Sequence, residues 1–252
     1  MLGRLGPIDR NPGWDANAPE RGESATVLAT VTMFRDMSQA HIDVLQAGGM
    51  AVEPRDGTTV FQQGEAADAV YAVIGGDGHV RIGAVDRNSK ALMVELFRVG
   101  DIFGEIGVID NGPRTASALA EGRVRLYKIR ASAFRSAMAQ SPELGTAMTK
   151  WLSQRLRRTF ELLQDATFET LEVRLARQIL YLVEREGRQT DAGYRLGHRL
   201  RQGDLADLLG ATTRSIITIL NAWRTAGVVV YDTDQARLTV CDVKALRALV
   251  HL

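Results

Sequence analysis

The chain has 252 residues with 31 Lys and Arg against 30 Asp and Glu, a formal net charge of +1, so overall charge indicates no class of partner. Hydrophobic residues make up 45% and charged residues 24%, as in a globular protein long enough to bury two domain cores. The single cysteine excludes an intrachain disulfide and a four-cysteine cluster, and the four histidines lack metal-ligand spacing, so we expect no metal.

No apolar run approaches the ~20 residues of a membrane span, and the N-terminus has no apolar signal-peptide core. We therefore expect a cytoplasmic protein without a membrane partner, which also fits the low cysteine count.

The first 140 residues change from a polar arm to a helix and then to short strands. Residues 1–30 carry three prolines among glycines and polar residues and are predicted to be a flexible arm. Residues 33–47 have apolar residues at helical spacing, with Ser38 as the N-cap of the second part. Short β-type runs with closely spaced turns follow, which is typical of a β-barrel or jelly roll. These runs lie at residues 58–62, 69–74, 79–85, 92–98 and 124–129.

Within this region, residues 103–116 place one acid and one arginine in an apolar segment punctuated by glycine. The flat fork of donors on Arg114 fits a phosphate, and the Glu105 carboxylate can accept a hydrogen bond from a sugar hydroxyl. Residues 105–109 are short enough for one helical turn after Gly104, and its free N–H groups would face an anion. Pro113 ends the turn just before Arg114. One ligand with a ribose and a phosphate close together would use all of these groups.

The same string resembles the phosphate-binding cassette of the cyclic-nucleotide-binding domain: Phe-Gly-Glu, two or three apolar residues, a short polar turn, then Pro-Arg-Thr/Ala-Ala. The resemblance implies that Glu105 holds the ribose 2′-hydroxyl and Arg114 the cyclic phosphate; the alternative is a structural ion pair at a barrel corner. The resemblance covers most of residues 33–140 and implies apolar residues that pack against the base. For each of these residues taken singly, a place in the barrel core is at least as good an interpretation. The implied nucleotide site here comprises Gly104, Glu105, Ile106, Arg114, Thr115, Ala116, Ile82 and Val94.

Thr115 bears on which nucleotide binds. In the family, Thr or Ser at this place goes with cGMP and Ala with cAMP, because a hydroxyl can accept a hydrogen bond from the exocyclic amine of guanine. Against this, cAMP-dependent bacterial regulators also tolerate Ser at this place. Thr159 matches a family position used for the adenine amino group, and Thr115 has the alternative of bonding only the phosphate. One neutral hydrogen bond is worth about 0.5–1.5 kcal/mol, so we expect both nucleotides to bind, with a small preference for cGMP.

A long helix is predicted from Ser141 to about Gln164. Ser141 suits the N-cap, Pro142 the first helical position and Glu143 the first turn. Such a helix leaving a small barrel indicates a homodimer contact, the alternative being a helix that lies on its own barrel. Residues 165–167 are the expected hinge. The seam of coiled-coil type consists of Met148, Leu152, Leu156, Thr159 and Leu163.

Beyond the hinge the pattern is helical again up to Gly187, and residues 188–200 are predicted to be a loop with short strands. Residues 202–209 form a short helix, Gly210 makes a turn, and Thr212 caps a second helix to about Thr225, which is the helix-turn-helix signature. A two-stranded wing follows over residues 228–240, and a last helix begins at Asp242.

Residues 204–215 resemble the DNA-binding domain of the CRP/FNR family of bacterial regulators, and a cassette, a long helix and a helix-turn-helix in this order are specific to that family. Many members carry Arg-Glu and a further Arg on the recognition helix, which this chain lacks, so the usual half-site is a poor guide to its operator. Residues 168–252 carry 12 Lys and Arg against 10 Asp and Glu, which supports DNA binding only mildly. The implied DNA contacts are Gln202, Thr212, Thr213, Arg214 and Thr218.

Together these patterns predict an α+β chain in four parts. They are a flexible arm (1–30), a β-barrel or jelly-roll cyclic-nucleotide-binding domain (31–140), a dimerisation helix (141–165) and a winged helix-turn-helix domain (168–252). We expect a homodimer that binds a double-stranded DNA operator in response to cGMP or cAMP, and that contacts RNA polymerase if it is an activator. The alternative is a regulator of the same fold with a different small-molecule effector or none. An enzyme is disfavoured, because no nucleophile–base pair, P-loop or metal cluster is present.

Overall fold

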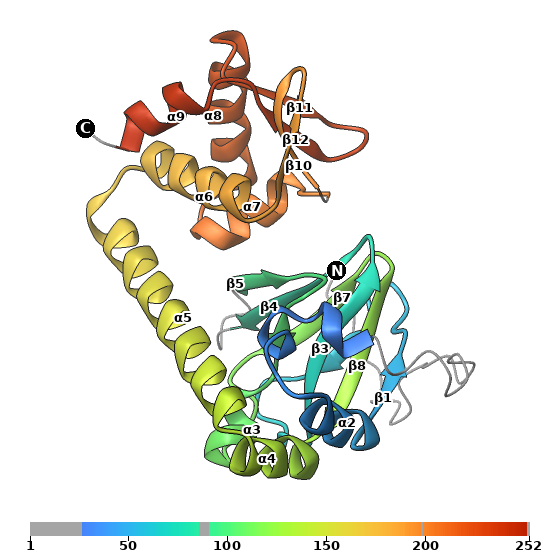
Figure 1. The fold of residues 1–252 in the computed structure, drawn as a ribbon. Helices are drawn as coiled ribbons and strands as arrows, with labels where there is room; N and C mark the ends of the chain where they lie inside the picture. The colour runs from blue at the N-terminus through green and yellow to red at the C-terminus, as the bar shows by residue number, and fades with distance from the viewer. Residues whose placement is uncertain (1–26, 86–90, 198, 251–252) are drawn as a thin grey trace. The chain divides into compact units, whose positions relative to one another are not determined.

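The computed structural model describes residues 27–85, 91–197 and 199–250, which divide into two compact units (Figure 1). The first unit runs to Ala84 and resumes over Leu96–Lys150, and the second comprises Val85–Glu95 and Trp151–Leu252. The mixture of helices and strands agrees with the predicted α+β class. Most of the predicted arm, residues 1–26, lies outside the described residues.

Two four-stranded sheets form the predicted β-region, with the strand orders β1-β8-β3-β6 and β2-β7-β4-β5. The five predicted strands are confirmed, with bounds within two residues of those expected, whereas the sequence does not predict β1, β6 or β7. The strands are β1 (Gly49–Val52), β2 (Thr59–Phe61), β3 (Ala69–Gly76), β4 (His79–Val85), β5 (Ala91–Phe97), β6 (Ile102–Phe103), β7 (Ser117–Glu121) and β8 (Val124–Arg130).

Burial along the strands explains their residues. The first five residues of β3 are all buried, so both faces of this strand are covered, and a strand covered on both faces is a continuous apolar run. β7 instead alternates buried and half-buried residues, as expected for a strand with one inward face. Tyr71 stacks on Phe103 at 5.3 Å between ring centroids, and Phe61 lies 5.8 and 6.0 Å from these two rings. We call Phe61, Tyr71 and Phe103 the aromatic cluster.

The helices of the first unit differ from the predictions in two places. The second part of the predicted segment is confirmed, because α2 (Gln39–Ala47) begins directly after Ser38. Its first part contains a 3-10 turn, η2 (Thr32–Phe34), which follows η1 (Leu28–Thr30), where the sequence predicts helical spacing. Ser38 is extended, with φ −64° and ψ 149°, and its hydroxyl contacts His41 Nδ1 at 3.1 Å instead of capping the backbone. Besides α3 (Ile106–Asp110), the unit contains α4 (Ala131–Gln140), which the sequence does not predict and which packs against α2 (Figure 1).

α5 (Pro142–Phe168) begins as predicted, because the amide of Leu144 donates to Ser141 Oγ at 3.2 Å. The helix continues past Gln164, so the predicted hinge at residues 165–167 is wrong. The chain leaves helical geometry only after Phe168, and Thr170 then caps α6 (Leu171–Glu186) by accepting from the amide of Val173 at 3.3 Å.

The helix-turn-helix has the predicted bounds. α7 (Gln202–Leu209) and α8 (Thr213–Thr225) are joined through Gly210, whose φ of 59° is left-handed, and Thr212 caps α8. Trp223 of α8 donates to Glu172 Oε1 of α6 at 2.9 Å, which ties the motif to the helix before it. Strands from both sides of the helix-turn-helix in the chain form a sheet of order β11-β12-β10-β9, which contains the predicted wing. Its strands are β9 (Gly187–Thr190), β10 (Gly193–Leu196), β11 (Val229–Asp232) and β12 (Arg237–Val240), and α9 (Val243–Val250) ends the described chain.

Candidate functional sites

The first candidate site is the cassette, residues 103–116, which joins β6 to β7 through α3. Gly104 has a φ of +78°, and a Cβ there would lie 2.7 Å from Arg114 Nη1. A Cβ on Gly107 would lie 2.7 Å from the carbonyl oxygen of Gly112. Both positions therefore require glycine, which explains the punctuation of the segment. α3 begins at Ile106, and Asn111 in left-handed geometry (φ 57°) ends it.

The turn before β3 holds the backbone of Arg114 on both sides. Its amide donates to the carbonyl oxygen of Glu65 at 2.8 Å, and its own carbonyl accepts from the amide of Gly64 at 2.9 Å. Pro113 forms an isolated antiparallel bridge with Ala66. The position of the arginine is thus set by a turn far earlier in the chain.

The side chain of Arg114 is buried, with 3% of the residue exposed. Nη1 donates to the carbonyl oxygen of Gly104 at 2.7 Å, and Nη2 to Asp68 Oδ1 at 3.0 Å. Its guanidinium carbon lies 4.1 Å from the centroid of the Phe61 ring, in cation–π contact with the aromatic cluster. The guanidinium is therefore fixed in place beside a glycine turn, and fixed cations of this kind suit an anion such as a phosphate.

Asp68 shares its carboxylate between two cations, since its Oδ2 accepts from Lys128 Nζ at 2.8 Å. Burial acts to raise the pKa of Asp68, but the hydrogen bond and charge of Lys128 and the charge of Arg114 outweigh it, so the pKa lies below its usual value. Asp68 is therefore ionised and partly neutralises Arg114. The sequence reasoning missed Asp68 and Lys128, and the only available signal was an acid placed directly before a buried strand.

The other predicted nucleotide residues fall into two groups. In the first unit, Glu105 is 3% exposed, Ile82 on β4 is buried, and Ile106 is 41% exposed at the start of α3. Thr115 is exposed directly after Arg114, and Ala116 is half-buried. Val94 and Thr159 belong to the second unit, where Val94 is exposed and Thr159 lies on α5, and their part in the site stays a prediction.

The second candidate site is the outward face of α8. The opposite face buries Ile216, Leu220 and Trp223 against the rest of the unit. Thr212 is exposed at the N-cap and accepts from the amide of Ser215 at 3.2 Å, whereas Gln202 at the start of α7 is half-buried. The residues of the first turns of α8 on its outward face include Thr213, Arg214, Ile217, Thr218 and Asn221, three of which are predicted DNA contacts.

Comparison with known proteins matches both regions. The model of the cyclic nucleotide-binding domain matches residues 51–141, and that of the Crp-like helix-turn-helix domain matches residues 173–249. The "CRP-like cAMP-activated global transcriptional regulator" of Mycobacterium tuberculosis H37Rv is 33% identical over 218 residues, which cover 84% of this chain and 96% of the relative. The chain belongs to the CRP/FNR family of transcription regulators.

One further relative and one solved structure are similar to this chain. The "Cyclic AMP receptor protein" of Thermus thermophilus is 28% identical over 175 residues, which cover 69% of this regulator and 76% of the relative. The solved structure of FixK2 from Bradyrhizobium japonicum has the same fold, with a TM-score of 0.69 at 18% identity, covering 80% of this chain and 96% of that one.

The regulator is therefore a cyclic-nucleotide-binding and DNA-binding member of a family of transcription regulators, and not an enzyme. No helix within the described residues has the length and apolar character needed to cross a membrane. In the same part of the chain, no three His, Cys, Asp or Glu side chains are grouped so as to hold a metal ion.

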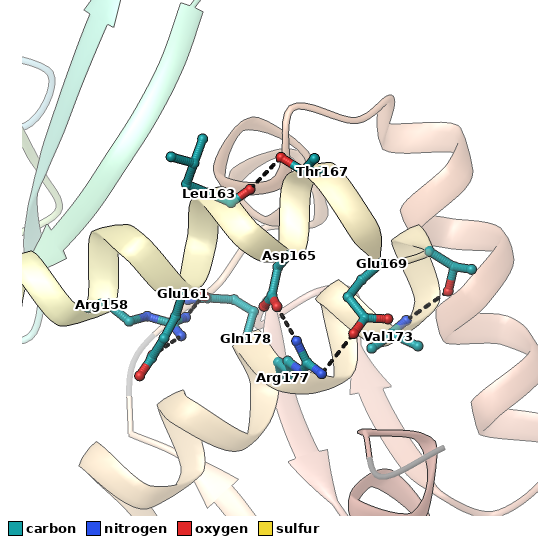
Figure 2. A network of polar contacts seen from close by, with 10 residues as sticks. Arg158, Glu161, Leu163, Asp165, Thr167, Glu169, Val173, Arg177 and Gln178 are labelled. Atoms are coloured by element: carbon teal, nitrogen blue, oxygen red, sulfur yellow. Dashed lines mark hydrogen bonds and ion pairs between the residues drawn. The ribbon is translucent and has the colours of Figure 1, made fainter.

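A polar network joins the end of α5 to α6 (Figure 2). Arg177 of α6 forms an ion pair with Asp165, which is buried, and donates from Nη2 to Glu169 Oε1 at 3.0 Å. Nearer the start of α5, Arg158 donates to Gln178 Oε1 at 2.6 Å. We call these five residues the junction network. The sequence does not predict it, because its members pair across two helices.

The predicted seam on α5 divides into a buried and an exposed part. Met148 is buried and Leu152 is half-buried. The seam residues Leu156, Thr159 and Leu163 are exposed, Leu156 by 57% and Leu163 by 61%. Phe160, which the sequence places beside the seam, is 57% exposed, and the spacing of Leu156, Phe160 and Leu163 puts these three side chains on one face. We call these three residues the exposed stripe. Exposed apolar side chains on one helix face form a candidate interaction surface.

Proposed function

We propose that a cyclic nucleotide binds at the cassette and switches the regulator, with Arg114 holding the cyclic phosphate and Glu105 the ribose 2′-hydroxyl. The observation that carries the proposal is the buried guanidinium of Arg114. Within the described part of the chain, its fork of five N–H groups donates to Gly104 and Asp68, which leaves donors for an anion. The apolar wall for the base would come from Ile82 and Val94.

We further propose that both cAMP and cGMP bind, with a small preference for cGMP. The relatives from M. tuberculosis and T. thermophilus are named for cAMP, which supports cAMP as one ligand. Thr115 supports cGMP, because it is exposed beside Arg114 and its hydroxyl can accept from the guanine amine. Thr159 is the proposed partner of the base on α5.

For the output, we propose a cytoplasmic homodimer that pairs through the exposed stripe of α5. The two copies of α8, the recognition helices, would enter successive major grooves of a double-stranded operator, about 34 Å apart. Arg214 would read a base edge, and the regulator would contact RNA polymerase where it activates transcription.

Calorimetric titration with cAMP and cGMP tests the nucleotide site. Arg114→Ala should lower the affinity for both nucleotides by about 100-fold or more, because two charge-assisted hydrogen bonds to the phosphate are lost. Arg114→Lys keeps the charge but not the fork and should also bind weakly. The matched control is Arg123→Ala, since Arg123 is a largely exposed arginine of the same unit. Circular dichroism confirms that each variant is folded.

Thr115→Ala tests the choice of nucleotide in the same titrations. We expect Thr115→Ala to lower the affinity for cGMP several-fold more than the affinity for cAMP, because one neutral hydrogen bond is lost. Equal losses for both ligands, or a wild-type protein that ignores cGMP, would reject the preference and leave cAMP as the ligand. A folded wild-type protein that binds neither nucleotide would favour a different effector or none.

A further inference from the structure

The outward face of α8 carries basic, polar and aliphatic side chains but no acidic one. The helix carries Arg214 and Arg224 but no aspartate or glutamate. In the major groove, a carboxylate recognises cytosine by accepting a hydrogen bond from its amino group, and α8 has no carboxylate with which to do so. The polar groups that remain suit other bases, because Arg pairs with guanine and Asn with adenine. Arg214 and Asn221 are the exposed residues of these two types in the first turns.

Ile217 lies among these polar residues and is 36% exposed. Its neighbours Ile216 and Leu220 are 0% and 2% exposed, so the helix already has its buried face without Ile217. Thr218 also contributes little as a donor, since its hydroxyl donates to the carbonyl oxygen of Arg214 at 3.0 Å. An aliphatic side chain on a face that contacts DNA adds most to the binding free energy where it packs against another apolar group and both are removed from water. In the major groove that group is the 5-methyl of thymine.

We propose that Ile217 contacts a thymine methyl and is a specificity-determining residue of this regulator. Its preferred half-site then contains a guanine for Arg214 and a thymine placed opposite Ile217. The inference rests on the proposed DNA-binding role of α8 and specifies the DNA sequence that this helix selects.

The test uses the full chain with saturating cAMP and, separately, cGMP. Binding sites are first selected from a pool of random duplexes, and each thymine of the enriched site is then replaced by deoxyuridine, which removes only the 5-methyl group. For the wild type, at least one replacement in each half-site should weaken binding about fourfold, as expected for one lost methyl-sized contact. Ile217→Ala should bind the thymine and deoxyuridine sites equally at that position, and Ile217→Val should keep most of the preference.

Val230→Ala is the matched control, because Val230 is an exposed aliphatic residue on β11, 52% exposed, and outside α8. It should leave the thymine preference unchanged. A wild type whose binding is unchanged by every deoxyuridine, or an Ile217→Ala variant that loses as much affinity on replacement as the wild type, would overturn the inference. Either result would leave the proposed DNA-binding role of α8 standing. A selection that enriches no sequence would overturn the proposed DNA-binding role and the inference with it.

Discussion

At the scale of single residues, the state of Arg114 depends on Asp68. Arg114 is almost wholly removed from water, and a buried cation is costly unless a negative group compensates it. Asp68 supplies that charge at 3.0 Å, and Lys128 competes for it at 2.8 Å. A bound phosphate would supply a second negative charge to the same guanidinium. Asp68 and the proposed nucleotide would therefore compensate the same cation.

Replacement of Asp68 by Asn tests this competition. Asp68→Asn keeps the shape but removes the charge, so the free energy of unfolding should fall for the protein without nucleotide. Nucleotide affinity should rise by up to about fivefold, because an ion pair with an exposed partner is worth about 0.2–1 kcal/mol. Thermal unfolding with and without nucleotide measures both effects. Asp77→Asn removes a similar charge from a largely exposed pair and is the control.

The same comparison has a predicted pH dependence. The pKa of Asp68 is lowered in the folded protein, so its contribution to stability is complete above the unfolded value of about 3.9 and is lost as pH falls through the folded pKa. The difference in stability between wild type and Asp68→Asn should thus be constant above about pH 5 and shrink in more acidic solution. A difference that grows on acidification would contradict the assignment.

The cassette and Asp68 differ in how far the sequence reveals them. Glu105 and Arg114 lie in one continuous string whose residue types already specify a turn and a fork of donors. Asp68 comes to Arg114 only through tertiary structure, because β3 pairs with β8 and the turn at residues 64–66 binds the cassette. Such pairings leave no periodic signal in the sequence.

At the scale of elements, the junction network explains why α5 does not end at the predicted hinge. Asp165 is buried on α5 because Arg177 of α6 pairs with it, and the same arginine reaches Glu169 just past the helix end. The last turn of α5 is thus held by the helix that follows it. A junction fixed in this way sets the direction in which α6, and the helix-turn-helix tied to it through Trp223, leave α5.

Arg177→Gln should release this junction. Both ion pairs are lost and Asp165 stays buried, so the free energy of unfolding should fall by about 1–3 kcal/mol, less than for a fully buried pair because Arg177 is 30% exposed. Denaturant unfolding measures this loss, and hydrogen exchange should show faster opening of residues 163–170. Arg157→Gln, at an exposed position of α5, should change neither. Unchanged hydrogen exchange of these residues in Arg177→Gln would show that the junction network does not hold the end of α5.

Elements with local signals match their predicted bounds, and elements without them do not. The left-handed Gly210 and the capping Thr212 delimit α7 and α8 within a few residues, and both bounds agree with the structure. β1 and β7, by contrast, are short strands specified by pairing with β8, β2 and β4, and the sequence does not predict them. The true end of α5 is likewise a tertiary effect, carried by Arg177.

At the scale of the whole molecule, the proposed dimer depends on the exposed stripe. Leu156, Phe160 and Leu163 expose more than half of their surface on one face of α5, at the spacing that forms a two-helix seam. A dimer would bury this surface and would also give two DNA-binding domains to one operator. Joining two half-site contacts in one molecule raises affinity by about 10²–10⁴ without any new contact.

Phe160→Glu places a charge in the middle of this stripe and should break the dimer, because an unpaired charge in an apolar contact is costly. Sedimentation velocity should give twice the 27.6 kDa chain mass for the wild type and the single chain mass for the variant. Operator affinity should fall by at least about 100-fold, since each chain then holds one half-site. Gln154→Glu adds the same charge at an exposed position on another face of α5 and should remain dimeric. A wild type already at the single chain mass, or a Phe160→Glu variant that stays dimeric, would show that the stripe does not join two copies of the chain.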